Sequence, residues 1–479
     1  MAKLRISAML VLFSAGAAIE AFHLTSLSSL NNADIWWHLS AGLWMLQHHS
    51  LPHVGIFSQS STLPWIASNW TYELLLAIVY KIVGLRAIPW LLMCFRTALA
   101  VLTFVLAGGM RGRFWIAAGL SVLAQYILGS VQPGPACFSI LFLGIELLLL
   151  LGARRGGNAR PLWWLPVLFL MWANLHVQFV YGVVVMILFL GEAAFETSGR
   201  SSSRLSAGQV GKIVAASLVA TLITPYLYGP YLVFVKATFN SANKYLPDFK
   251  ALGFRQPQDY LLLLLAMSAF LTLGLRRSRG LFQITVLAFS LGIAFYSQRD
   301  IWIVVLASLA VIGEATANDE MFSAEERRKS ARDMWTALAA VLAIIVLVFL
   351  ARVPRHREAL LAEVGQSYPV AAADYIREHR LQQPLFNAYE WGGFLTWYLP
   401  EYPVVIDSRA DLYGPDAITE YSKVMNAEVP FTGYQMLAGA QIVLLPKKAM
   451  MGVALSSVPQ FKVEYSDDVA VVLVPRAMP

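Results

Sequence analysis

Charged residues are scarce in this sequence. They make up 14% of the 479 residues, whereas hydrophobic residues make up 58% and the mean hydropathy is +0.59. A soluble domain carries about a quarter charged residues, so the composition excludes an ordinary soluble protein. The chain is also too long for one core of usual size. The sequence therefore predicts a polytopic α-helical membrane protein.

Cysteine is scarce too, and the common metal and nucleotide motifs are missing. Cys94 and Cys137 lie in or beside apolar runs without CxxC spacing, which excludes a disulfide scaffold. No Gly-rich phosphate loop of the Walker or Rossmann type occurs. The net charge is +7, but the basic residues form short clusters between apolar runs. Nucleic-acid binding needs a continuous basic face, so we expect no nucleic-acid partner.

Long apolar runs dominate what is present. A membrane-spanning helix needs about 20 apolar residues, and by this measure we expect about 11 spans. The first run follows Lys3 and Arg5 and resembles a signal peptide, but the many later runs favour an uncleaved first helix. The expected spans lie near residues 6–27, 87–108, 114–131, 135–153, 161–175, 178–195, 209–229, 258–275, 280–296, 301–318 and 334–352.

The segment Thr71–Leu85 decides the topology. It is apolar but short, and it carries Glu73 and Lys81. If it lies flat in the membrane interface, every basic cluster falls on one side, as the positive-inside rule requires. These clusters are Lys3 and Arg5; Arg111 and Arg113; Arg154, Arg155 and Arg160; Arg200, Arg204 and Lys212; Arg276, Arg277 and Arg279; and Arg327, Arg328, Lys329 and Arg332.

This topology predicts a bacterial inner-membrane protein with a cytoplasmic N-terminus. The periplasmic regions are then the first loop at 28–86, the turns at Gln132 and His176, the loop at 230–257, the turn at Arg299, and the tail. We expect a transmembrane domain over 1–353, which includes the first loop, and a periplasmic domain over 354–479. In the tail, the alternating runs Val404–Asp407, Gln441–Leu445 and Val469–Val474 interleave with helical stretches such as Val370–His379. This pattern predicts a small α/β domain.

The first loop holds the clearest candidates for chemistry. Asp34 and His38 are four residues apart and would share one face of a helix. Trp36, Trp37 and Trp44 are typical of a helix at the membrane surface. A carboxylate there can act as a general base for a hydroxyl acceptor. The alternative is that Asp34 caps the helix and His38 lies on its polar face.

Other polar residues fall on the predicted outer side. Asn174 and His176 interrupt an apolar stretch, which suggests that they line a protein cavity. Arg299 could hold a phosphate, or it could anchor the chain at the interface. Arg96 and Glu146 lie within spans and are expected either to pair with each other or to serve catalysis. Glu20 could face the same cavity.

The tail supplies a further cluster. Asp407, Arg409 and Asp411 follow a predicted strand, where loops often carry binding groups. Two aspartates four residues apart could hold a divalent cation, whereas the alternative is a salt-bridged turn that docks the tail. The candidate substrate-binding residues are therefore Trp37, Asn69, Glu73, Arg96, Gln132, Asn174, His176, Arg299, Asn387, Trp391, Asp407, Arg409 and Asp411.

These motifs resemble those of the GT-C superfamily of membrane glycosyltransferases. The resemblance covers nearly the whole chain. It is carried by Asp34-Ile-Trp-Trp-His-Leu with Gly42, by Pro52–Ser58, by Trp172-Ala-Asn-Leu-His176, by Asn387 with Trp391-Gly-Gly, and by Ile406-Asp-Ser-Arg-Ala-Asp-Leu-Tyr-Gly414. It is most specific for a group of bacterial GT-C-like membrane proteins.

The resemblance implies inverting transfer of a sugar from a polyprenyl-phosphate donor to a saccharide, lipid or protein acceptor on the periplasmic face. It assigns Asp34 as the catalytic base, with His38 beside it, and Arg96 or Arg299 to the lipid phosphate. Many members pair acidic residues in the first loop, whereas Trp-Trp-His follows Asp34 here. This difference favours a non-catalytic assembly partner as one alternative. A second alternative is a transporter or flippase of lipid-linked saccharides, which would carry charged residues in mid-bundle and internal repeats.

The topology makes a direct prediction about the tail. A cysteine placed near Gly414 should react with a membrane-impermeant thiol reagent added to intact cells, because the tail is expected outside. The labelling is compared with that of the unsubstituted chain. Labelling that appears only after permeabilisation would contradict the outer tail.

Overall fold

The computed structural model describes residues 28–109, 114–198, 205–240, 249–275, 280–315, 343, 347, 353–354 and 356–476. The predicted first span at 6–27, with Glu20, lies outside these residues, and so does nearly all of the predicted last span at 334–352. The chain divides into two compact units. The helical unit comprises Met1–Ser26, Trp90–Tyr228 and Pro247–Val353, and the mixed unit comprises Leu27–Pro89, Gly229–Leu246 and Pro354–Pro479.

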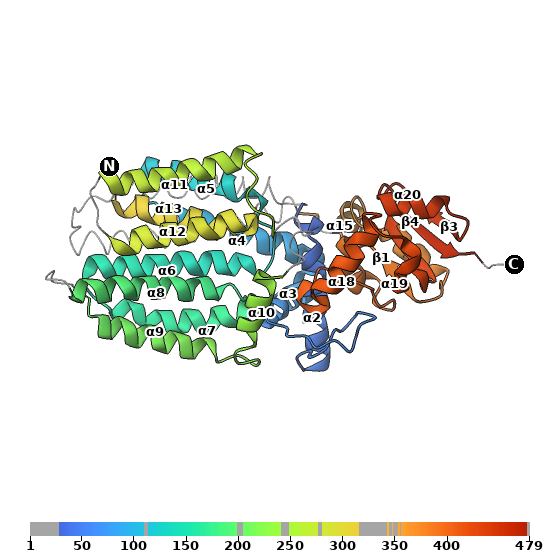
Figure 1. The fold of residues 1–479 in the computed structure, drawn as a ribbon, viewed down its shortest axis with the longest axis horizontal. Helices are drawn as coiled ribbons and strands as arrows, with labels where there is room; N and C mark the ends of the chain where they lie inside the picture. Colours follow the sequence, from blue (N-terminus) through green and yellow to red (C-terminus); the bar gives the residue numbers. More distant parts are fainter. Residues whose placement is uncertain are drawn as a thin grey trace. The chain divides into compact units, whose positions relative to one another are not determined.

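The helical unit consists of long apolar helices that lie side by side (Figure 1). They form because their sequences are apolar on nearly every face and contain few helix breakers. Helix α6 packs on α7, α8 and α13, while α12 contacts both α8 and α13. The helices are α4 (Ala87–Leu106), α5 (Phe114–Ile127), α6 (Ala136–Gly156), α7 (Leu165–Leu175), α8 (Phe179–Ser198), α9 (Ala207–Thr221), α11 (Pro257–Leu275), α12 (Leu281–Tyr296) and α13 (Ile301–Ala315).

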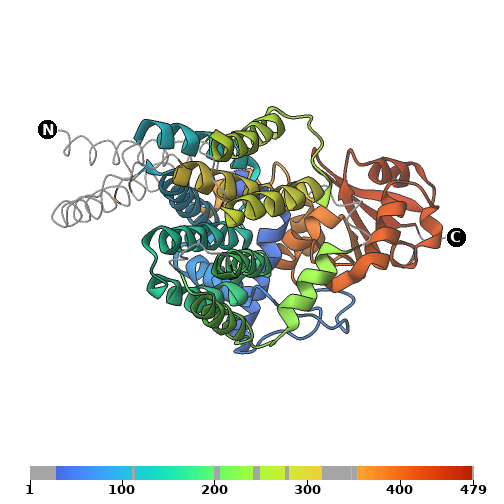
Figure 2. The ribbon, with the colours of Figure 1, turned by 60° about the vertical axis from the view of Figure 1, so that its left-hand side comes forward.

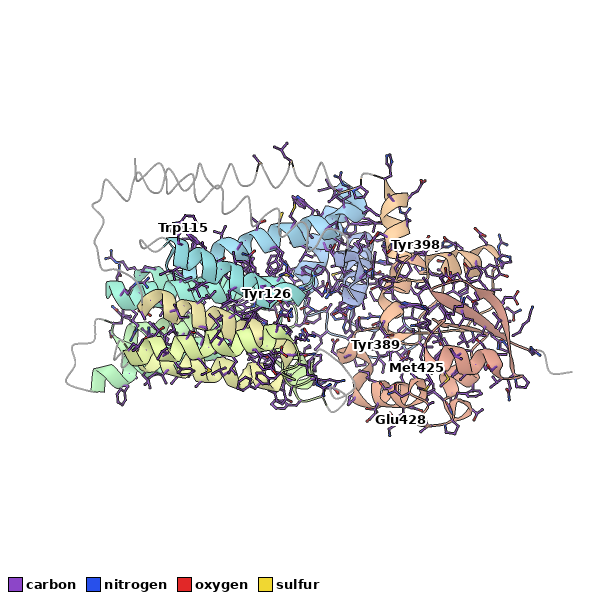
Figure 3. All side chains as sticks on the ribbon, turned by 90° about the horizontal axis from the view of Figure 1, so that it is seen from above. Trp115, Tyr126, Tyr389, Tyr398, Met425 and Glu428 are labelled. Atoms are coloured by element: carbon purple, nitrogen blue, oxygen red, sulfur yellow. The ribbon has the colours of Figure 1, made fainter. Side chains whose placement is uncertain are left out.

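Each predicted span within the described residues coincides with one of these helices. By length and composition, three described helical segments could cross a membrane: Trp70–Leu106, Ala136–Gly156 and Pro257–Leu275. The first of these contains α3 (Trp70–Val83), the short turn η2 (Gly84–Arg86) and α4. Helix α3 confirms that residues 71–85 are mainly helical, and its position flat in the interface stays a prediction. Exposed aromatic side chains such as Trp115 and Tyr126 on α5 suit a lipid-facing surface (Figure 3).

An ion-pair cluster joins four helices of the helical unit. The guanidinium of Arg154 on α6 binds Glu192 on α8 at 3.1 Å and Glu314 on α13 at 3.4 Å. Gln283 on α12 donates to the second carboxylate oxygen of Glu314 at 2.7 Å. The cluster therefore fixes the ends of α6, α8, α12 and α13 relative to one another.

The mixed unit combines the first loop with the tail. From the loop come η1 (Ser28–Asn31), α2 (Ala33–His48) and α3, and α10 (Gly229–Thr238) joins them. The tail adds α15 (Arg357–Val364), α16 (Val370–Glu378), β1 (Leu385–Asn387), α17 (Tyr389–Tyr398), α18 (Ala410–Met425), η9 (Phe431–Gly433), α19 (Gln435–Ala438), β2 (Ile442–Pro446), α20 (Met450–Ser457), β3 (Phe461–Ser466) and β4 (Ala470–Pro475) (Figure 2). Residues 27–89 thus pack with the tail, and the predicted division at residue 353 stays a prediction.

The tail forms a four-stranded mixed sheet in the order β1-β2-β4-β3. Strand β1 pairs in parallel with β2, and the other pairs are antiparallel. The strands expected at Gln441–Leu445 and Val469–Val474 are confirmed as β2 and β4, and the helix expected at Val370–His379 is confirmed as α16. The tail is therefore the α/β fold that the alternating runs predict.

The strand expected at Val404–Asp407 is wrong. Among the described residues this segment makes one isolated bridge, from Val404 to Ser58 of the first loop. The side chain of Asn387 takes the place of a strand partner. Its Oδ1 accepts from the backbone N–H of Val405 at 2.9 Å, and its Nδ2 donates to the carbonyl of Ile406 at 2.8 Å. A side-chain amide thus satisfies backbone groups that a neighbouring strand would otherwise bind.

Glycines allow the first loop and the tail to approach closely. A Cβ on Gly42 of α2 would clash with the carbonyl oxygen of Glu73 on α3, and one on Gly392 would clash with the carbonyl of Ile406. On Gly393 of α17, a Cβ would lie 2.5 Å from the carbonyl oxygen of Ala33. The Gly-Gly pair after Trp391 therefore serves close backbone packing.

Replacing Gly42 with alanine should push α2 and α3 apart. Because the clash is with backbone, which cannot rotate away, we expect a loss of about 1–3 kcal/mol in the free energy of unfolding. Chemical denaturation in detergent measures it. The matched control is Gly119→Ala in α5, where an added Cβ meets no heavy atom within 4 Å. Equal stability of the two variants would contradict the close contact at Gly42.

Candidate active site

The first helix of the loop presents Asp34 at its start. Asn32 caps α2, because its Oδ1 accepts from the backbone N–H groups of Asp34 at 2.6 Å and Ile35 at 3.1 Å. The interpretation of Asp34 as the cap is therefore wrong. Its carboxylate is exposed in the first turn, where the helix dipole favours negative charge.

Two tryptophans link Asp34 to the tail. Nε1 of Trp37 donates to Oδ1 of Asp34 at 3.4 Å, and the Trp37 indole meets that of Trp65 edge-on at 6.1 Å between ring centres. Nε1 of Trp65 in turn donates to Oδ2 of Asp411 at 3.2 Å. Both indoles are buried and both carboxylates belong to exposed residues. The Trp37–Trp65 pair thus presents one carboxylate from the loop and one from the tail.

His38 is buried against Trp37. Only 2% of the residue is exposed, and its Nδ1 lies 3.1 Å from Oε1 of the fully buried Glu73. Its ring also packs against Trp37 at 3.6 Å and Tyr72 at 5.2 Å between ring centres. The interpretation of His38 as a polar-face residue is therefore wrong. Burial, reinforced by the positive charge of Arg409, holds the pKa of His38 well below its usual range.

The tail aspartates are held by a salt-bridged turn. Arg409, itself fully buried, binds both carboxylate oxygens of Asp407, with Nη2 at 2.6 Å from Oδ2. Tyr413 donates to the same carboxylate at 3.0 Å, and Arg409 also donates to the carbonyl of Ile56 at 2.9 Å. Because Asp407 is neutralised, Asp407 and Asp411 do not offer two free carboxylates to a divalent cation. Over the described ranges, no group of three or more histidine, cysteine or acidic side chains fits a metal.

Asn387 and Trp391 are occupied by internal hydrogen bonds. Asn387 holds the backbone at Val405 and Ile406 as described above, and Nε1 of Trp391 donates to the carbonyl of Ser367 at 3.0 Å. Both residues are buried. Asn69 differs, because it stands at the start of α3 and its Oδ1 has no hydrogen-bond partner among the described residues.

Two residues that the sequence reasoning did not select lie in this region. Tyr389 begins α17 and is followed by the exposed Glu390 (Figure 3). Burial and the nearby negative charges of Asp34, Asp407, Glu390 and Asp411 raise the pKa of Tyr389 well above its usual range. The sequence feature that could have identified Tyr389 and Glu390 is their position directly before the Trp391-Gly-Gly motif. This part of the mixed unit is therefore acidic, with a phenol that stays protonated.

The remaining candidates belong to the helical unit, and Arg96 is the clearest correction. Its guanidinium donates to the carbonyls of Leu128 at 2.6 Å, Gly129 at 2.8 Å and Val131 at 2.8 Å. The expected pairing with Glu146 is therefore wrong. Arg96 is used to bind the free carbonyls where α5 ends.

The outer-turn candidates have separate partners. Asn174 donates to the carbonyls of Leu170 and Ile223, and Nδ1 of His176 lies 2.7 Å from the hydroxyl oxygen of Ser139. Arg299 is exposed, with its guanidinium over the ring of Phe249 at 5.1 Å. Gln132 is exposed between α5 and α6.

Asp300, which the sequence reasoning missed, is buried beside Arg299. It accepts from Gln178 at 2.5 Å and from Tyr181 at 3.0 Å. These contacts join α8 to the turn between α12 and α13. The only feature of the sequence that points to Asp300 is its position next to Arg299, which the sequence analysis did select.

Comparison with known proteins identifies solved structures with a similar fold. No family model and no curated protein sequence matches the chain. The apo crystal structure of the Archaeoglobus fulgidus oligosaccharyltransferase aligns over 92% of this chain and 69% of its own, with 11% identity and a TM-score of 0.51. The chain shares the fold of that structure. The resemblance in sequence motifs thus extends to the fold.

A second solved structure of this fold is similar over a larger share of its length. ArnT from Cupriavidus metallidurans bound to undecaprenyl phosphate aligns over 98% of each chain, with 15% identity and a TM-score of 0.49. The shared fold therefore rests on the archaeal structure.

The buried imidazole predicts a pH dependence of stability. Burial lowers the pKa of His38 from its usual 6.5 and raises the pKa of its partner Glu73 from 4.5 to about 8. As the pH falls, the unfolded chain gains a proton at His38 more readily than the folded chain, which weakens folding. The folded chain meanwhile holds a proton on Glu73 that the unfolded chain releases, which strengthens folding as the pH falls from about 8 to 4.5. Melting temperatures in detergent measure the sum of the two effects. His38→Asn removes the weakening effect, so this variant should gain stability relative to the unsubstituted chain as the pH falls, and the same pH dependence in both proteins would contradict the assignment.

Proposed function

We propose that the protein is a membrane glycosyltransferase. It transfers a sugar from a polyprenyl-phosphate-linked donor to a hydroxyl acceptor on the periplasmic face of the inner membrane. The observation that carries the proposal is the exposed carboxylate of Asp34, held at the start of α2 by the Trp37 indole, in a chain that shares the fold of an oligosaccharyltransferase. The acceptor is a saccharide, lipid or protein.

Asp34 acts as the general base. Its carboxylate takes the proton of the acceptor hydroxyl while that oxygen attacks the anomeric carbon of the sugar. The bond from this carbon to the phosphate oxygen breaks as the new glycosidic bond forms, so the configuration inverts. The exposed position of Asp34 in the first turn of α2 gives an acceptor hydroxyl access to its carboxylate.

His38 and Glu73 position Asp34 indirectly, through Trp37. His38 is too buried to meet an acceptor, but its ring packs directly on Trp37, which binds Asp34. The contact between His38 and Glu73 ties α2 to α3. We therefore assign His38 a positioning role in place of direct catalysis.

The departing phosphate needs a cation, and Arg299 is the better of the two candidates. The guanidinium of Arg96 already donates hydrogen bonds to three backbone carbonyls, whereas Arg299 is exposed. An exposed guanidinium can bind a phosphate through two hydrogen bonds.

A transporter of lipid-linked saccharides is the second candidate. It is favoured by one observation, the presence of Glu146 fully buried in the middle of α6, because transporters carry ionisable groups in mid-bundle. The extended mixed unit, built from the first loop and the tail, supports the enzyme.

Replacement of Asp34 with Asn tests the base. Transfer from a polyprenyl-phosphate donor in proteoliposomes should fall by about 10²–10⁴-fold, since a general base contributes about that factor. Arg299→Ala should raise KM for the donor. The matched control is Asp468→Asn, which changes an exposed aspartate in the β3–β4 turn and should keep full activity. Full activity of Asp34→Asn would remove the base assignment, and no transfer by the wild type with any donor would favour the transporter or an assembly partner.

A further inference from the structure

Glu146 has no role in the proposed glycosyl transfer. It lies in the middle of α6 with 0% of the residue exposed, and neither of its carboxylate oxygens has a hydrogen-bond partner among the described residues. A buried polar group without a partner is rare in folded proteins and calls for an explanation. The expected partner, Arg96, binds backbone carbonyls instead.

Three helices enclose the carboxyl group. Gly182 on α8 is so close that an added Cβ would lie 2.6 Å from Oε2 of Glu146, 2.6 Å from the Trp172 ring and 2.9 Å from the Phe169 ring. Trp172 and Phe169 belong to α7. The carboxyl group is therefore packed against a glycine backbone and two aromatic rings, with no side-chain donor beside it.

The titratable groups on the surrounding helices are engaged elsewhere. His176 after α7 contacts Ser139, and Tyr181 on α8 donates to Asp300. At the other end of the unit, Glu192 on α8 and Glu314 on α13 bind Arg154 of α6. No cation among these groups is left to balance a charge on Glu146.

An ionised carboxylate cannot persist in such a place. Burying a charge without a hydrogen bond or counter-ion costs more than the whole stability of a typical domain, whereas a neutral carboxyl costs far less. The neutral form also suits contact with the Trp172 and Phe169 rings and the Gly182 backbone. The packing therefore selects the protonated side chain.

We propose that Glu146 is a proton-binding site within the helical unit, and that the contact of α6 with α8 at Gly182 depends on the bound proton. Release of the proton to water leaves a carboxylate that must be hydrated. Hydration requires α8 to move away from α6 and α7, because the carboxyl group is enclosed when they touch. The bundle thus has a closed, protonated state and an open, deprotonated one, whatever reaction the mixed unit performs.

Infrared spectroscopy of the purified full chain in phosphatidylethanolamine and phosphatidylglycerol vesicles tests the proton. Burial raises the pKa of Glu73 to about 8, so Glu73 gives a band of its own, which cancels when two spectra are subtracted. At neutral pH the spectrum of the wild type minus that of Glu146→Gln should contain the C=O stretch of a protonated carboxyl group. The matched control is Glu192→Gln on α8, which removes an ion-paired carboxylate and should give no such band in its difference spectrum. A difference spectrum of Glu146→Gln without this band would overturn the proposal.

Transfer into D₂O tests the coupling to α8. In the wild type the band should shift slowly, because the carboxyl group is sealed, whereas Gly182→Ala should wedge α8 outward and make the shift fast. An immediate shift in the wild type, or equal rates in the two proteins, would overturn the dependence on α8. If Glu146→Gln fails to fold, alkaline titration of the wild type replaces it: loss of the band together with faster deuterium exchange of the backbone amides supports the proposal, and loss of the band without faster amide exchange contradicts it.

Discussion

The mixed unit depends on the contact of one helix from the tail with one helix from the first loop. Gly393 of α17 lies against the carbonyl of Ala33, the residue before Asp34. Beside this contact Trp36 stacks on Trp397 at 4.9 Å between ring centres, and the hydroxyl of Thr396 donates to that of Ser40 at 3.1 Å. The start of α2, and with it the direction of Asp34, is therefore fixed by the tail. A side chain at Gly393 would displace all three of these contacts.

Local hydrophobic patterns in the sequence predicted most of the described helices and strands. The apolar runs within the described residues form helices, and the alternating runs at Gln441–Leu445 and Val469–Val474 form strands, since period and composition act within a few residues. The strand prediction at Val404–Asp407 is wrong because the side chain of Asn387, 18 and 19 residues away in sequence, binds the backbone of Val405 and Ile406. No periodicity carries that information. The residues of the Gly-Gly and Asp-Ser-Arg-Ala-Asp motifs were found, but their roles in packing and ion pairing depend on tertiary contacts.

The candidate site was predicted in its residues more than in its roles. Spacing placed Asp34 and His38 on one helix, but only the structure shows that one is exposed and the other buried against Glu73. Likewise, Arg96 and Glu146 are an obvious pair by charge, yet Arg96 meets carbonyls at the end of α5. Opposite charges on different helices pair only when their rotations about the helix axes agree, and a single sequence does not specify those rotations.

The mixed unit is assembled from distant parts of the chain, and this has a consequence for its biosynthesis. The hydrogen bond from Thr396 to Ser40 closes a separation of 356 residues, and that from Trp65 to Asp411 closes one of 346. Contacts of this range form late, so α2 emerges from the ribosome long before its partner exists. A prematurely ended chain would contain Asp34 but not the surface that orients it. The contacts that orient the start of α2 can therefore form only after the ribosome has passed residues 393–411.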